Sequence, residues 1–193
     1  MQKTKSEKYN NILNSAGHVF AEYGFHKATI SQIASQAGVA DGTLYLYFKN
    51  KDDILLQYLN FKSDSVFSRM RAAVEAGKNA EDKLRRLIRC HLSEFQNDKD
   101  MAVIFRSEVR HFRDIETQIK DISKMYLELL SEIIEQGQIE GTMRQDLFAA
   151  LAKRYILGGV ENVISSWVFA GSRYDLESLA DPLVDLFLTG IRG

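Results

Sequence analysis

The chain has 193 residues, a formal net charge of −1, 45% hydrophobic and 26% charged residues, which is typical of one or two globular domains. It contains one cysteine, which excludes an intramolecular disulfide and a multi-cysteine metal site, and one proline, the strongest helix breaker. Because signal-peptide and transmembrane patterns are absent, we expect a soluble, cytoplasmic protein. Alternating strand patterns are also missing, so the sequence predicts an all-α fold of about nine helices.

Positive charge is concentrated at the start of the chain. Six lysines and three acidic residues precede Asp52, which gives +3 there and leaves −4 for the remainder. A nucleic-acid-binding protein of near-zero net charge can carry its positive charge in one domain. The distribution therefore favours an N-terminal DNA-binding domain followed by an acidic partner domain.

Two helices are predicted before residue 40. Apolar residues at helical spacing up to Tyr23, with Ser6 as the expected N-cap, predict the first helix. Thr29 and Gln32 are three residues apart, which is the pattern of a capping box at the start of a second helix. Gly38 lies where a left-handed glycine would end that helix.

A short third helix is expected after a tight turn. Asp41 would cap a helix over residues 42–48, where small and hydroxyl side chains come first, then tyrosines, with lysines just beyond. A helix of this kind suits insertion into a DNA major groove. With the helix before it, it forms a predicted helix-turn-helix at about residues 30–49, within a DNA-binding domain over residues 1–53.

Residues 54–193 predict a helical bundle for ligand binding and dimerisation. A long fourth helix is expected from its N-cap Asn50 to about Val74, so it joins the two domains without a flexible linker. Gly137 would follow the end of the seventh helix, and Pro182 implies a kink in the last helix or a later start. The other helices are expected over residues 80–95, 101–112, 115–136, 147–170 and 176–191.

Motifs in the first quarter of the chain resemble the TetR family of transcriptional regulators. These motifs are Phe20-x-x-x-Gly24-Phe25, Thr29-Ile30-x-x-Ile33-Ala34, Ala37-Gly38-Val39 and Gly42-Thr43-Leu44-Tyr45-x-Tyr47-Phe48-x-x-Lys51-x-x-Ile54-Leu55. A single helix-turn-helix gives weak specificity, so a homodimer on a double-stranded, palindromic DNA operator is expected, and the resemblance implies the same. Repression is the usual mode of this family, and we adopt it on that ground.

Seven residues are predicted to contact DNA. The hydroxyl of Thr29 and the helix amides beside it can bind a phosphate, while Thr43 and Tyr45 can reach base edges. Gly42 would permit close approach of the backbone, and Lys49 would add positive charge. The resemblance implies that Tyr47 and Lys51 contact phosphates. The alternative is a solvated helix with surface tyrosines. The predicted contact residues are Thr29, Gly42, Thr43, Tyr45, Tyr47, Lys49 and Lys51.

Further stretches are similar to the fatty-acid-degradation branch of the family, whose members release DNA when they bind long-chain acyl-CoA. These stretches are Val39-Ala40-Asp41-Gly42-Thr43, Tyr45-Leu46-Tyr47-Phe48-Lys49-Asn50-Lys51, Glu108-Val109-Arg110, and Trp167-Val168 with Tyr174-Asp175-Leu176. The resemblance implies a repressor of fatty-acid-degradation genes with an acyl-CoA effector. The alternative is a regulator of efflux with a different hydrophobic, drug-type effector, for which Glu108 and Glu161 are candidate carboxylates.

Ten residues are predicted to bind the effector. Large apolar side chains would line an acyl tunnel, and clustered arginines would hold the phosphates of CoA. The alternatives are ordinary core packing for the apolar residues and a solvated, ion-paired face for the arginines. The predicted residues are Phe95, Phe105, Arg106, Val109, Arg110, Arg113, Tyr126, Leu130, Trp167 and Phe169.

The last two helices are the expected dimer interface, because Gly158, Gly159 and their apolar faces allow close packing. Two locations are kept as alternatives for Trp167, the effector pocket and this dimer interface. The four histidines are dispersed and no HExxH or GxSxG pattern occurs, so no catalytic residues, no metal site, no cofactor and no enzyme activity are predicted.

Overall fold

The computed structural model describes residues 5–107 and 116–191, and within these ranges it contains nine α-helices, one short 3₁₀-helix and no strands. The prediction of an all-α fold is confirmed. The helices are α1 (Lys5–Tyr23), α2 (Ile30–Ala37), α3 (Asp41–Leu44), α4 (Lys51–Glu75), α5 (Ala80–Asn97), α6 (Lys99–Ser107), α7 (Glu116–Ile139), α8 (Ala149–Phe169), the 3₁₀-helix η2 (Glu177–Leu179) and α9 (Ala180–Ile191).

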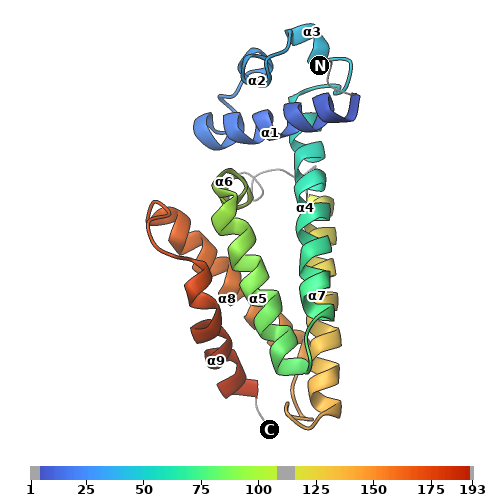
Figure 1. Cartoon of the computed structure of the whole chain (residues 1–193), viewed down its shortest axis with the longest axis vertical. Coiled ribbons are helices and arrows are strands. Elements are labelled where there is room, and N and C mark those ends of the chain that lie inside the picture. The colour runs from blue at the N-terminus through green and yellow to red at the C-terminus, as the bar shows by residue number, and fades with distance from the viewer. Residues whose placement is uncertain (1–4, 108–115, 192–193) are drawn as a thin grey trace.

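Figure 1 shows α1, α2 and α3 gathered at one end of an elongated molecule. The long helix α4 runs from this end beside α7, and α5, α8 and α9 complete the bundle. Helix α6 lies between the bundle and α1 and contacts α1 extensively. None of the helices in the described ranges combines the length and apolar character needed to cross a membrane.

The predicted helix ends around α2 and α4 are confirmed. Thr29 Oγ1 accepts a hydrogen bond from Gln32 N at 3.2 Å, and Gln32 Oε1 accepts one from Thr29 N at 2.8 Å, which completes the capping box. Gly38 ends α2 in the left-handed conformation, with φ of 68°. Asn50 Oδ1 accepts from Asp53 N at 2.8 Å and caps α4.

The third helix differs from its prediction. Helix α3 covers only Asp41–Leu44, and the chain continues as hydrogen-bonded turns such as Tyr47 N to Leu44 O at 2.9 Å. Asp41 is not the N-cap, because its carboxylate accepts a hydrogen bond from the hydroxyl of Ser31 in α2 instead. Ser6 likewise lies inside α1 and does not cap it.

Two helix boundaries in the bundle also differ from their predictions. Helix α7 passes through Gly137, and a Cβ at this position would lie 2.6 Å from the Met143 sulfur. Gly141, with φ of 72°, follows the end of the helix. Pro182 is the third residue of α9, where its missing N–H removes no bond within the helix. Of the two alternatives for Pro182, the later helix start is confirmed. The predicted end of the sixth helix and the Asp114 cap of the seventh lie outside the described residues.

The buried side chains form two apolar cores that share α4. The N-terminal core holds residues from α1, α2 and α3 with residues 54–59 of α4, and the bundle core includes residues 66–74 of α4. Ile104 of α6 is buried in the N-terminal core, and Phe105 packs against both cores. The two units are therefore packed together through α4 and α6, and a domain boundary between residues 53 and 54 stays a prediction.

Helix α1 crosses α4 at close range. A Cβ on Gly17 would lie 2.4 Å from Cε2 of Tyr58, so any side chain at this position would push the two helices apart. Glycine at residue 17 thus fixes how α4 leaves the N-terminal unit.

Candidate functional sites

The predicted DNA-contact residues lie together at the N-terminal end of the molecule. Leu44 and Phe48 are buried in the N-terminal core, which turns the rest of this segment outward. Tyr45 is 62% exposed, so its ring and hydroxyl are available to a ligand. Thr29, Gly42 and Lys49 are also exposed, whereas Thr43, Tyr47 and Lys51 are half-buried.

Lys51 has a structural role that the sequence did not indicate. Its Nζ donates hydrogen bonds to the carbonyl oxygens of Phe25 at 2.7 Å, His26 at 3.2 Å and Ala28 at 2.8 Å. The ammonium group also lies 4.6 Å from the centroid of the Phe25 ring. Lys51 therefore holds the turn between α1 and α2, directly before Thr29, and its contact with phosphate stays a prediction.

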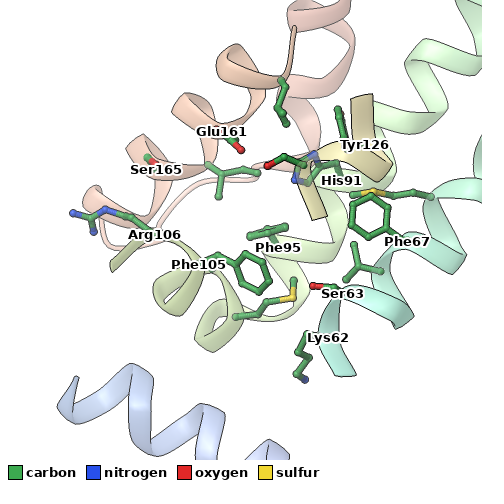
Figure 2. A pocket seen from close by; sticks show the side chains of 17 residues that line it. Lys62, Ser63, Phe67, His91, Phe95, Phe105, Arg106, Tyr126, Glu161 and Ser165 are labelled. Carbon is green, nitrogen blue, oxygen red and sulfur yellow. The ribbon is translucent and has the colours of Figure 1, made fainter. Parts of the chain in front are cut away.

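A cavity of about 300 Å³ lies in the bundle among α4, α5, α6, α7 and α8, and most of its wall is apolar (Figure 2). This volume is at the lower end of the range of about 300–1,000 Å³ found for small-molecule sites. The lining residues are Lys62, Ser63, Val66, Phe67, Met70, His91, Phe95, Met101, Ala102, Phe105, Arg106, Ser123, Tyr126, Leu157, Glu161, Ile164 and Ser165.

Four of the ten predicted effector residues, Phe95, Phe105, Arg106 and Tyr126, line this cavity. Figure 2 shows Arg106 at the side formed by α6 and α8, and Tyr126 on the opposite side beside His91. The guanidinium carbon of Arg106 lies 3.1 Å from the ring centroid of Phe169, which is 73% exposed and outside the cavity. Phe169 therefore supports Arg106 and does not form part of the wall.

Two other predicted effector residues, Leu130 and Trp167, are buried in the bundle core and are not among the lining residues. The indole Nε1 of Trp167 donates to Tyr174 O at 2.8 Å, which anchors the segment after α8. Trp167 thus packs inside its own chain. Val109, Arg110 and Arg113 lie outside the described residues.

Buried polar atoms on the cavity wall are the main feature that the sequence predictions missed. Ser63 Oγ, His91 Nδ1 and Tyr126 Oη have no hydrogen-bond partner within residues 5–107 and 116–191, although all three side chains are buried. Burial lowers the pKa of His91 from its ordinary 6.5 to about 3, so the imidazole is neutral at physiological pH. An isolated histidine on an apolar helix face has no local pattern that separates a core residue from a ligand contact.

Polar contacts connect the cavity wall to the N-terminal unit. Lys62, which lines the cavity, donates from Nζ to Asn14 Oδ1 of α1 at 3.0 Å and to Asp98 Oδ2 at 2.8 Å. His18 Nδ1 of α1 lies 3.0 Å from Asp100 Oδ2 of α6. Both the cavity wall and α6 therefore contact α1 directly.

Exposed apolar residues form a face on α8 and α9. Leu151, Tyr155 and Leu186 are all more than half exposed, and Gly158 has open space where a Cβ would lie. Gly159 differs, because a Cβ there would lie 2.8 Å from the Phe187 ring of α9. The two glycines thus lie on different surfaces of α8, with Gly159 facing α9 and Gly158 facing open space.

Comparison with known sequences assigns both parts of the chain. Residues 12–58 match the sequence profile of the tetR family of bacterial regulatory proteins, and residues 60–190 match that of the YsiA-like protein C-terminal region. The chain belongs to the TetR family. It is accordingly a DNA-binding transcriptional regulator, and the predicted resemblance is confirmed.

Similar proteins extend over nearly the full length. The fatty acid metabolism regulator protein of Bacillus subtilis is 36% identical over 190 residues, 98% of each chain. The crystal structure of FadR from Bacillus subtilis in complex with stearoyl-CoA has a TM-score of 0.89 at 35% identity, over 95% of this chain and 99% of that one. The fatty acid degradation regulator FadR from Bacillus halodurans has a TM-score of 0.91 at 35% identity, over 97% and 98% of the two chains.

Proposed function

We propose that this TetR-family protein is a cytoplasmic repressor of fatty-acid-degradation genes that a long-chain acyl-CoA releases from its operator. The observation that carries the proposal is the cavity among α4 to α8, because one of its lining residues, Lys62, also contacts α1. A relative with 35% identity binds stearoyl-CoA, which supports the choice of ligand class. The acyl-CoA acts as an effector and is not chemically changed, so no catalytic residues or cofactor are assigned.

DNA binding is proposed for the seven residues at the N-terminal end. The exposed ring and hydroxyl of Tyr45, with Thr43, would reach base edges, and Thr29 would bind a phosphate at the start of α2. Gly42 permits close backbone approach, while Tyr47, Lys49 and Lys51 would contribute phosphate contacts and charge. Because few long polar side chains are available to read the bases, specificity would also depend on the spacing between the two half-sites.

The homodimer that this spacing requires is proposed to form through α8 and α9. The apolar face with Leu151, Tyr155 and Leu186 would be covered by the same face of a second copy. Gly158 would allow the two copies of α8 to approach closely, because it has no side chain and nothing of its own chain above it. A twofold-symmetric dimer matches a palindromic operator.

In the proposed complex, the acyl chain lies among the apolar wall residues and the CoA phosphates lie near Arg106. Arginine suits this role because its planar guanidinium group can bind phosphate in a bidentate manner. Arg110 and Arg113 are proposed as further phosphate ligands. Filling the cavity would wedge apart α4 and α6, swing α4 and change the separation of the two recognition segments. The effect is limited by the difference in ligand affinity between the two states.

A hydrophobic, drug-type effector is the second candidate, because the carboxylate-bearing Glu161 lines the cavity. Native mass spectrometry of the full chain purified from cells, with stearoyl-CoA added to a second sample, distinguishes the two candidates. We expect a retained or added CoA ester, and we expect Arg106→Ala to weaken its binding at least tenfold. Arg86→Ala removes an arginine of α5 outside the cavity and serves as the matched control. A retained organic cation, or no binding of stearoyl-CoA, would overturn the acyl-CoA assignment.

A further inference from the structure

The wall of the cavity carries three polar groups whose hydrogen-bonding capacity is unused. They are Ser63 Oγ of α4, His91 Nδ1 of α5 and Tyr126 Oη of α7, and none has a partner among the described residues. Each of the three side chains is more than nine-tenths buried. Three helices thus bring hydrogen-bonding atoms to a cavity whose wall is otherwise mainly apolar.

These groups lie away from the side at which CoA is proposed to bind. Figure 2 shows Arg106 and Ser165 at one side of the cavity, and His91 and Tyr126 at the other. On the Arg106 side, Arg106 and Ser165 are half-buried, whereas Ser63, His91 and Tyr126 are buried. A CoA group held near Arg106 would therefore direct the distal part of the acyl chain toward the three polar groups.

A saturated acyl chain is a poor match for this wall. Methylene groups would displace water and leave two hydroxyl groups and a ring nitrogen without a partner, and such unpaired buried groups are costly. The imidazole ring packs between the rings of Phe95 and Tyr126, each with its centroid 5.1 Å from that of His91, so it cannot turn freely toward solvent. Neutral groups of this kind favour a neutral hydroxyl or carbonyl oxygen as partner.

We propose that the preferred effector is an acyl-CoA whose chain carries a hydroxyl or keto oxygen in its distal part, bound by Ser63, His91 and Tyr126. This inference rests on the proposed function, because it takes the acyl-CoA and its orientation at Arg106 from it. The three residues are then specificity-determining residues of the effector site. Sites built to hydrogen-bond a ligand hydroxyl discriminate strongly against the analogue that lacks it.

The test compares oleoyl-CoA with ricinoleoyl-CoA, which differ only by a hydroxyl group in the distal half of the acyl chain. Isothermal titration calorimetry on the full-length protein gives the Kd of each ligand, and the ratio of the two Kd values is compared between variants. Because both Kd values come from the same variant, a general effect of the substitution on folding changes them equally and leaves their ratio unaffected. We expect ricinoleoyl-CoA to bind wild type at least tenfold more tightly. Tyr126→Phe and Ser63→Ala should each reduce this ratio at least threefold, whereas Ser165→Ala, which removes a hydroxyl from the opposite side, should leave it unchanged.

The outcomes separate this inference from the function on which it rests. Equal affinity, or tighter binding of oleoyl-CoA, would overturn the preference for an oxygenated chain and leave the acyl-CoA effector in place. A wild-type ratio that persists in both Tyr126→Phe and Ser63→Ala would overturn the assignment of the residues. Failure of both ligands to bind would overturn the proposed function itself.

Discussion

The N-terminal unit and the bundle use polar groups in different ways. Around α2 and the start of α4, polar side chains are paired over short distances along the chain, as in Thr29 with Gln32 and Asn50 with Asp53. The one buried side-chain polar atom without a partner in the described N-terminal core is the hydroxyl of Tyr58, a residue of α4 that packs against α1. The bundle instead surrounds a cavity with three such groups. The polar groups of the unit that binds DNA are therefore largely paired within the chain, while the bundle keeps binding capacity for an effector.

The largest expected effect comes from removing a ring in the N-terminal core. Phe20→Ala should lower the free energy of unfolding by about 3–5 kcal/mol, because Phe20 is buried in the N-terminal core and a void would remain. Phe67→Ala on the cavity wall should lower the free energy of unfolding by about 1.5–3 kcal/mol, the value for transfer of the side chain out of water. The loss is smaller because this substitution enlarges an existing cavity and creates no new one. Urea denaturation of both variants measures the difference. Equal losses would contradict the distinction between the two cores.

A smaller effect is expected from Lys51→Ala, which breaks the turn between α1 and α2. Loss of a charged donor to three carbonyl oxygens should lower the free energy of unfolding by about 1.5–3 kcal/mol. If the proposed phosphate contact also exists, the slope of log affinity for DNA against log salt should become shallower by about 0.9. Urea denaturation and salt titrations of DNA binding give the two values. Reduced stability with an unchanged salt slope would limit Lys51 to its role in the fold.

The buried imidazole of His91 should make the bundle sensitive to acid. Its pKa is lowered to about 3 by burial, so the unfolded state, with a pKa near 6.5, binds a proton that the folded state does not. Its contribution to stability is complete above pH 6.5 and falls below it, by up to about 1.4 kcal/mol per pH unit. The difference in unfolding free energy between wild type and His91→Gln should therefore shrink between pH 6.5 and 5. A constant difference across this interval would show that His91 titrates alike in both states.

The smallest effect on stability is expected at the DNA-facing surface. Tyr45→Phe removes an exposed hydroxyl group, so the free energy of unfolding should change by less than about 0.5 kcal/mol. Affinity for a selected operator should nevertheless fall, while affinity for unrelated DNA should not, because base contacts determine sequence preference. Fluorescence anisotropy with the two DNA fragments separates these effects. A uniform loss on both fragments would assign Tyr45 to the phosphate backbone.

The same contrast explains how much of the structure was predictable from the sequence. Some features depend on residues a few positions apart, and their predictions are confirmed. They are the number of helices in the described residues, the capping box at Thr29, the end of α2 at Gly38 and the start of α4 at Asn50. The prediction that Asp41 caps α3 is wrong, because the Asp41 carboxylate accepts a hydrogen bond from Ser31, which lies ten residues earlier in the sequence. A capping pattern covers only a few neighbouring residues, so it does not take into account a hydrogen-bond donor from another helix.

The cavity was predictable only in part for the same reason. Phe95, Phe105, Arg106 and Tyr126 were expected from their residue types and line the cavity. Ser63 of α4 and His91 of α5 acquire their importance through burial at the cavity wall, which no spacing in the sequence encodes. Sequence periodicity indicates that a helix face is apolar, but it does not show whether that face closes on other side chains or borders a cavity.

The central claim is that filling the bundle cavity weakens DNA binding at the other end of the molecule. Its most direct test is the Kd for a palindromic fragment, selected by the protein from random DNA, measured by fluorescence anisotropy with and without saturating oleoyl-CoA. We predict that oleoyl-CoA raises this Kd at least tenfold, equivalent to a coupling free energy of about 1.4 kcal/mol, and that DNA weakens oleoyl-CoA binding by the same factor. An unchanged Kd at saturating oleoyl-CoA would contradict the claim.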